Sequence, residues 1–149
     1  MANSAFENLK DDFEFIDDWE ERYKYVIELG KAMPALPQDQ QSELNKVHGC
    51  VSQVWIKSEF PVDENGVRHL QFLGESDAMI VRGLVAILRI LMNGQPLTEI
   101  IALDAVSELA SLGLNDHLTP QRSNGLNSMI KRLHADALIA SRAIPATPE

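Results

Sequence analysis

Cysteine is the scarcest reactive residue in this sequence, because Cys50 stands alone among 149 residues. One cysteine cannot form an internal disulfide, and this usage is typical of a protein in a reducing cytosol. A chain of this length buries about 70% of its unfolded surface, so it needs no disulfide or metal to stabilise the fold. We therefore expect one domain over residues 1–149 and a cytoplasmic location.

Basic residues are also few. The chain has 13 Lys and Arg against 22 Asp and Glu, which gives a net charge of −9. A field of that sign repels phosphate backbones, so we expect no nucleic-acid partner, whereas a basic patch on another protein remains compatible. The longest apolar run, residues 78–92, is interrupted by Arg82 and Arg89 and is too short and too charged to span a bilayer. The N-terminus lacks the basic start and apolar core of a signal peptide, so we expect no membrane association.

Several motifs for cofactors and metals are missing. The glycines are isolated from one another, so there is no phosphate-binding loop. The four histidines and the cysteine show no zinc-motif spacing, and an iron–sulfur cluster normally takes about four cysteines. No protease signature surrounds Cys50. We expect no cofactor.

Capping patterns and apolar periodicity predict two helices near the N-terminus. The first starts at Ser4. The second starts at Asp18 and ends near Gly30, because Pro34 and Pro37 forbid its continuation.

A small antiparallel sheet is predicted next. Residues 46–48 are expected to form a brief strand, and residues 52–60 a longer one with alternating apolar positions. The Asp-Glu-Asn-Gly sequence at 63–66 is a strong turn signal. Residues 67–73 then return as the partner strand, which Gly74 ends.

The remaining chain is predicted to be helical. Residues 77–92 form the most apolar segment and are expected to be the central helix, with Ser76 as its N-cap. Short helices follow at Pro96 and at 105–112, and a long final helix covers 125–143. Because the strands are grouped and do not alternate with helices, the fold class is α+β.

The surroundings of Cys50 favour a displayed thiol, although a free cysteine is more often a buried, inert residue. Gly49 precedes it, and the nearby His48 and Ser52 are polar. Reactivity requires the thiolate, and an ordinary cysteine has a pKa of about 8.5. A protonated His48 would favour the thiolate, but we prefer to interpret it as an exposed loop histidine, because no spacing rule joins the two side chains. The residues alone predict a cytosolic α+β domain with one displayed thiol.

Five blocks of sequence carry a resemblance to a known family. They are residues 19–23 with 27–30 (WEERY, IELG), 49–55 (GCVSQVW), 74–78 (GESDA), 80–84 (IVRGL) and 118–126 (LTPQRSNGL). In this order they resemble the SufE family of sulfur-acceptor proteins, and the match covers nearly the whole chain.

The resemblance implies a fold like that of the iron–sulfur scaffold IscU, with helices packed on a three-stranded antiparallel sheet. It also implies that Cys50 accepts sulfur from the persulfide of a pyridoxal-phosphate cysteine desulfurase of the SufS type and stimulates that enzyme. The sulfur is then passed to a SufBCD-type assembly complex. We expect a sulfurtransferase-like carrier with no independent enzymatic activity.

Other matched positions allow two interpretations. Ser76 and Asp77 either cap the following helix or position the Cys50 loop, together with Gly49 and Ser52. Arg122, expected in a polar loop, either contacts the desulfurase or favours a thiolate, or else it forms a structural ion pair. His48 stands where the family often has glutamine, so the resemblance assigns it no role.

Two rival functions remain. The first is an IscU-like iron–sulfur scaffold. The second is a regulator that stimulates the desulfurase without carrying sulfur.

Overall fold

The computed structural model describes residues 4–49 and 52–143. Within these residues it has six α-helices and one two-stranded antiparallel sheet, which confirms the α+β class. The helices are α1 (Ser4–Phe15), α2 (Trp19–Ala32), α3 (Met79–Met92), α4 (Leu97–Ala102), α5 (Ala105–Ala110) and α6 (Pro120–Ala143). The strands are β1 (Val54–Glu59) and β2 (Gln71–Ser76), and the short 3-10 turns are η1 (Gln38–Gln40), η2 (Glu43–Asn45) and η3 (Leu114–Asp116).

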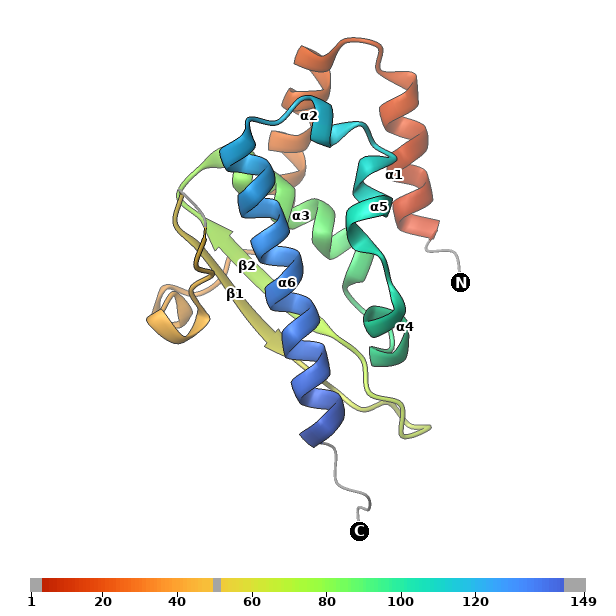
Figure 1. The fold of residues 1–149 in the computed structure, drawn as a ribbon, viewed down its shortest axis with the longest axis vertical. Helices are drawn as coiled ribbons and strands as arrows, with labels where there is room; N and C mark the ends of the chain where they lie inside the picture. The colour runs from red at the N-terminus through yellow and green to blue at the C-terminus, as the bar shows by residue number, and fades with distance from the viewer. Residues whose placement is uncertain (1–3, 50–51, 144–149) are drawn as a thin grey trace.

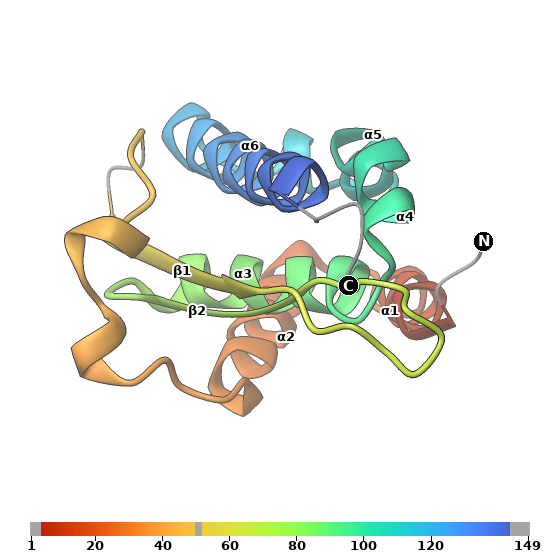
Figure 2. The same cartoon turned by 90° about the horizontal axis from the view of Figure 1, so that it is seen from below.

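The sheet lies between helices. Figure 1 shows α6 crossing the two strands, and the turned view in Figure 2 places α6 on one side of the sheet and α2 on the other. Helix α3 contacts α1, α2, β2 and α6, and it is therefore the element around which the core is built.

The central position of α3 follows from its sequence. Leu84, Val85, Ile87 and Leu88 are each at most 1% exposed, because neighbouring elements cover the helix on several sides. The prediction of a central helix is confirmed, but α3 begins at Met79 and not at residue 77. In the described parts of the chain, no helix combines the length and the apolar character needed to cross a membrane.

Two glycines allow α2 and α3 to pack closely. A Cβ atom on Gly30 would lie 2.7 Å from the backbone nitrogen of Gly83, and one on Gly83 would overlap the backbone carbonyl of Val26. The prediction that Gly30 ends the second helix is wrong, since α2 continues to Ala32. Gly30 is a packing position: the missing side chain lets the two backbones approach.

The sheet differs from the predicted one at both ends. Strand β2 continues through Gly74, which pairs with Ile56, and ends at Ser76. The predicted third strand at 46–48 is not confirmed: in the described residues Lys46 forms only an isolated bridge with Trp55. A single backbone hydrogen bond, from Val47 N to Val54 O at 2.8 Å, continues the contact.

The connection between the strands contains the predicted turn. The Asp63 side chain accepts hydrogen bonds from the backbone N–H groups of Asn65 (2.8 Å) and Val67 (2.9 Å). Gly66 has a φ of 81°, as this turn requires. The turn prediction is confirmed, although regular pairing of β1 with β2 starts only at Glu59 and Gln71.

Helix α6 begins five residues earlier than predicted. Thr119 caps the helix, because its hydroxyl accepts the backbone N–H of Arg122 at 3.2 Å, and Pro120 occupies the first helical position. Proline is favoured there because its missing N–H is not needed by the helix. Arg122 therefore lies in the first turn of α6 and not in a loop.

Candidate functional site

The predicted sulfur-accepting residue, Cys50, lies with Val51 outside the described residues. The structure describes the chain on both sides, up to Gly49 and from Ser52 onward. The geometry of these two flanks, and of the elements that hold them, defines the candidate site.

The flank before Cys50 is held against α6. Gly49 has a φ of 93°, and a Cβ atom there would lie 2.6 Å from the Ser128 hydroxyl of that helix. Arg132 of α6 donates hydrogen bonds to the carbonyl oxygens of Leu44 (3.0 Å) and Lys46 (3.1 Å). Glycine is favoured at residue 49 by this positive φ, whereas the Ser128 hydroxyl could rotate away from an added Cβ atom.

The side chain of His48 lies next to the carboxylate of Glu43. Its Nε2 atom lies 3.2 Å from a carboxylate oxygen of Glu43, and its side chain is 71% exposed. The geometry agrees with an exposed loop histidine paired with a neighbouring acid.

The flank after Cys50 is held by Asp77. The backbone N–H of Gln53 donates to Oδ1 of Asp77 at 3.0 Å, and the backbone N–H of Asp77 donates to the Gln53 carbonyl at 3.3 Å. Neither Ser76 nor Asp77 is the N-cap of α3, so the prediction of Ser76 as N-cap is wrong: the N-cap is Ala78, with no side-chain cap hydrogen bond. Ser76 accepts the N–H of Ala78 at 3.2 Å, so it closes the turn before the helix. The interpretation of Asp77 as a positioning residue is the one that agrees with this geometry.

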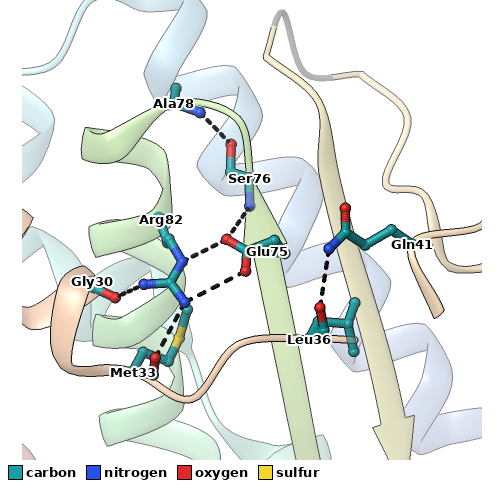
Figure 3. A network of polar contacts seen from close by, with 8 residues as sticks. All are labelled: Gly30, Met33, Leu36, Gln41, Glu75, Ser76, Ala78 and Arg82. Atoms are coloured by element: carbon teal, nitrogen blue, oxygen red, sulfur yellow. Dashed lines mark hydrogen bonds and ion pairs between the residues drawn. The ribbon is translucent and has the colours of Figure 1, made fainter. Parts of the chain in front are cut away.

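A polar network fixes the strand end that carries Asp77. Figure 3 shows how Arg82 of α3 joins two other elements. Its guanidinium donates to the carboxylate of Glu75 on β2 and to the carbonyl oxygens of Gly30 and Met33 at the end of α2. The Nε to Oε1 distance to Glu75 is 2.5 Å, and both side chains are mostly buried. The same carboxylate accepts the backbone N–H of Ser76 at 3.2 Å. The end of β2 is thus attached to α2 and α3 through one arginine.

A cavity of about 190 Å³ lies beside Ser52. Its walls come from Ser52, from α3 and from the start of α6 with its cap; the lining residues are Ser52, Val81, Leu84, Thr119, Gln121, Arg122, Gly125, Leu126 and Met129. The cavity is therefore apolar on the α3 side and polar at the N-terminus of α6.

Arg122 supplies the positive charge of this cavity. Among the described residues it has no carboxylate within ion-pair distance, so the structural ion pair considered for it is not found there. A guanidinium stays protonated and favours anions nearby. Within the same described residues no group of three or more His, Cys, Asp or Glu side chains is placed to hold a metal ion.

Comparison with known families decides what kind of protein carries this site. Residues 7–137 match the model of the SufE family, whose description is an Fe-S metabolism associated domain. The chain belongs to the SufE family. An uncharacterized SufE-like protein of Rhizobium etli is 48% identical over 141 residues, covering 94% of each chain. Another from Rhizobium meliloti is 46% identical over 134 residues, covering 90% of this chain and 95% of the relative.

A solved structure shares the fold. The solution structure of a hypothetical protein from Thermus thermophilus aligns with a TM-score of 0.75 and 21% identity. The alignment covers 96% of this chain and all of that chain. The architecture of this SufE protein is thus found in another protein with low sequence identity.

Sequence reasoning placed most of the site residues but missed their supports. It gave Glu75 and Arg82 no role, because a contact between a strand end and a helix has no local sequence signal. It also missed the apolar wall formed by Leu126 and Met129 with α3. The start of α6 was recoverable, since Thr followed by Pro is a common beginning of a helix.

Proposed function

We propose that this SufE protein is a sulfur acceptor. Its Cys50 takes persulfide sulfur from a pyridoxal-phosphate cysteine desulfurase of the SufS type and passes it to a SufBCD-type assembly complex. The observation that carries the proposal is that the chain of this SufE protein has a single thiol, and that Ser52, two residues after it, lines a cavity that also contains Arg122.

The proposed transfer needs one thiol and no redox partner. The Cys50 thiolate attacks the terminal sulfur of the donor persulfide, so a new S–S bond forms while the donor S–S bond breaks. The donor cysteine leaves as a thiolate, and the terminal sulfur keeps its oxidation state. A second cysteine would attack the Cys50 persulfide and form a disulfide, so a single cysteine is an advantage for a carrier.

Closeness in the sequence supports a role for the cavity. Ser52, which lines the cavity, follows Cys50 by two residues. In this proposal Arg122 favours the thiolate, and the apolar α3 wall shields a persulfide from water. The Asp77 contact holds Gln53, three residues after Cys50 in the sequence, at the end of β2.

Mass spectrometry tests the proposal directly. After incubation with a SufS-type desulfurase and cysteine, we expect one additional sulfur on Cys50, and none on a Cys50→Ser variant. An Arg122→Gln variant should acquire the sulfur more slowly. A separate measurement of its affinity for the desulfurase shows how much of the slower transfer is due to weaker binding. A wild-type chain without added sulfur under active turnover would refute the acceptor role.

The two rival functions have their own measurements. A regulator that carries no sulfur would leave the Cys50→Ser variant fully able to stimulate desulfurase turnover. A scaffold would assemble a stable cluster when the chain is supplied with iron and sulfide, and this would be visible as absorbance. For the proposed acceptor we expect the Cys50→Ser variant to lose the stimulation of desulfurase turnover. We also expect the wild-type chain to assemble no stable cluster.

A further inference from the structure

A second cavity lies along the other half of α6. It has a volume of about 490 Å³ and is formed by η2, the edge of β1 and the last turns of α6. Its lining includes Asp136, which is 14 residues after Arg122 on α6, or about 21 Å along a helix. The groove is therefore separate from the cavity beside Ser52.

One charged cluster in this groove is already satisfied. The Nε atom of Arg132 lies 3.2 Å from both carboxylate oxygens of Asp136, and the Ser58 hydroxyl donates to the same carboxylate at 2.9 Å. The remaining guanidinium nitrogens of Arg132 bind the carbonyl oxygens of Leu44 and Lys46. Asp136 is thus neutralised, and it does not repel an incoming anion.

Two other cations in the groove keep unused donors. Arg68 donates from Nη1 to the carbonyl of Phe60 at 3.0 Å, while its buried Nε has no acceptor among the described residues. Lys57 forms no ion pair within the same part of the chain. The Nη2 atom of Arg68 also has no acceptor among the described residues and, unlike Nε, is not buried, so it is the donor that an incoming carboxylate can reach.

The rim of the groove is apolar and exposed. Leu44 is 83% exposed on η2, and Ile139 is 63% exposed on α6. Both side chains line the groove together with the cations Lys57 and Arg68. Exposed apolar side chains close to unpaired cations are typical of surfaces that bind another protein.

We propose that this groove binds an extended, acidic segment of a partner protein that carries alternating apolar side chains. Its carboxylates pair with Arg68 and Lys57, and its apolar side chains cover Leu44 and Ile139. Charge complementarity selects this occupant, because the groove is a cationic site on a chain of net charge −9. Residues 46–47 bond to the outer edge of β1 at Val54 and Trp55, whereas the edge from Lys57 to Glu59 pairs with no other strand in the described residues and can accept an extended backbone.

The proposal is tested by selecting peptides on the full chain. A displayed library of random hexapeptides is enriched on the wild-type protein, and the enriched peptides are synthesised with blocked ends. We expect sequences that combine Asp or Glu with Leu, Ile, Val or Phe. Their affinity, measured by fluorescence anisotropy, should fall about tenfold in Arg68→Gln and severalfold in Leu44→Ser.

Matched variants separate the groove from the rest of the surface. Lys131→Gln removes an exposed cation of α6 outside the groove, and Phe15→Ser removes an apolar side chain that is 92% exposed on α1. Both should leave peptide affinity unchanged. Because Arg68→Gln alters a half-buried residue, Lys57→Gln serves as the second charge variant, and amide spectra verify the fold of each.

Four outcomes would overturn the proposal. The first is an absence of enriched acidic–apolar peptides, and the second is equal affinity for the wild type and the groove variants. The third is competition by citrate alone at the affinity of the peptides, which would indicate a small-anion site. The fourth is a concentration-dependent dimer that Ile139→Ser abolishes, which would make a second copy of the chain the occupant.

Discussion

The α2–α3 contact and the Gln53–Asp77 contact hold this protein together in opposite ways. The first joins two helices through glycines, with backbone against backbone and a mostly buried arginine closing the joint. The second joins an exposed loop residue to an exposed aspartate by two hydrogen bonds. One contact excludes water, and the other is made in its presence.

This difference indicates how the scaffold and the site divide their tasks. Closely packed backbones move apart only at a high cost in free energy, so the contact between α2 and α3 fixes the position of β2. A solvent-exposed pair of hydrogen bonds contributes modestly to stability and can open at low cost. Gln53, three residues after Cys50 in the sequence, is thus attached to a rigid strand end by an exposed contact.

The largest effect is expected from adding one methyl group inside the α2–α3 joint. Gly83→Ala places a Cβ atom against the backbone carbonyl of Val26, where neither helix can shift easily. We expect unfolding free energy to fall by about 3 kcal/mol, which outweighs the gain of about 1 kcal/mol in helix propensity. Urea denaturation measures the change.

A surface variant serves as the control for this substitution. Ala135→Ser adds one atom to an exposed position of α6, and its effect should stay within about 0.5 kcal/mol. If Gly83→Ala were no more destabilising than this control, the close packing of the two helices would not be a source of rigidity.

The next largest effect is expected at Arg82. Arg82→Gln leaves the Glu75 carboxylate, 16% exposed, without its partner and frees two carbonyl oxygens at the end of α2. We expect a loss of about 2 to 3 kcal/mol in urea denaturation. The exposed pair of Lys24 and Glu21 supplies the control: Lys24→Gln should leave the urea midpoint almost unchanged, because water screens an exposed ion pair. Equal losses for both variants would contradict the structural role of the network.

A smaller effect on stability, but a specific effect on reactivity, is expected at Asp77. Asp77→Ala removes the acceptor for Gln53 N and should cost about 1 kcal/mol at most, because the contact is exposed. The alkylation rate of Cys50 by iodoacetamide should change severalfold, since the segment loses one anchor. Asp77→Asn keeps the Oδ1 acceptor and should restore the rate toward that of the wild type. Identical rates in Ala and Asn variants would argue against positioning through this bond.

The smallest effect is expected at the far end of the sheet, where His69 joins the turn to the end of α3. Its Nε2 lies 2.9 Å from Asp63 Oδ2 and its Nδ1 lies 3.0 Å from the Gly94 carbonyl. These hydrogen bonds, chiefly that with Asp63, raise the pKa of His69 above its ordinary value. The stabilisation is therefore complete below the ordinary histidine pKa and is lost as pH rises through the raised value.

NMR titration of the His69 ring measures this effect. Asp63→Asn should bring the pKa of His69 back toward its ordinary value, and the wild-type urea midpoint should decline more than that of His69→Gln as the solution becomes alkaline. An unchanged His69 pKa in Asp63→Asn would show that the exposed pair makes no electrostatic contribution.

Local signals predicted much of the fold. The apolar run at 77–92 became the central helix α3, and the Asn-Gly turn at 65–66 joined the two strands. Three boundary errors occurred where a glycine or a threonine had a tertiary role or a capping role, at Gly30, Gly74 and Thr119. Gly30 was expected to end a helix, because its contact with Gly83, 53 positions away (83 − 30), leaves no trace in the neighbouring sequence.

The candidate site was predicted less completely than the fold. Cys50 was identified from its solitude, its polar neighbours and the family resemblance, and its acceptor role remains a proposal. Asp77 was predicted either to cap a helix or to position the loop, and only its hydrogen bond with Gln53, 24 residues away, separates these interpretations. Arg122 was placed in a loop, whereas the Thr119 cap brings it into the first turn of α6 and beside the cavity.

The sequence by itself determined the fold class, the family, the negative charge and the presence of a single thiol, because composition, periodicity and motifs are properties of the chain. Only the tertiary structure decided that two glycines let α2 and α3 touch, that Arg82 ties three elements together, and that α6 lines one cavity near Ser52 and another near Leu44. These features depend on which distant residues meet when the core closes, and no local pattern of side chains specifies that pairing.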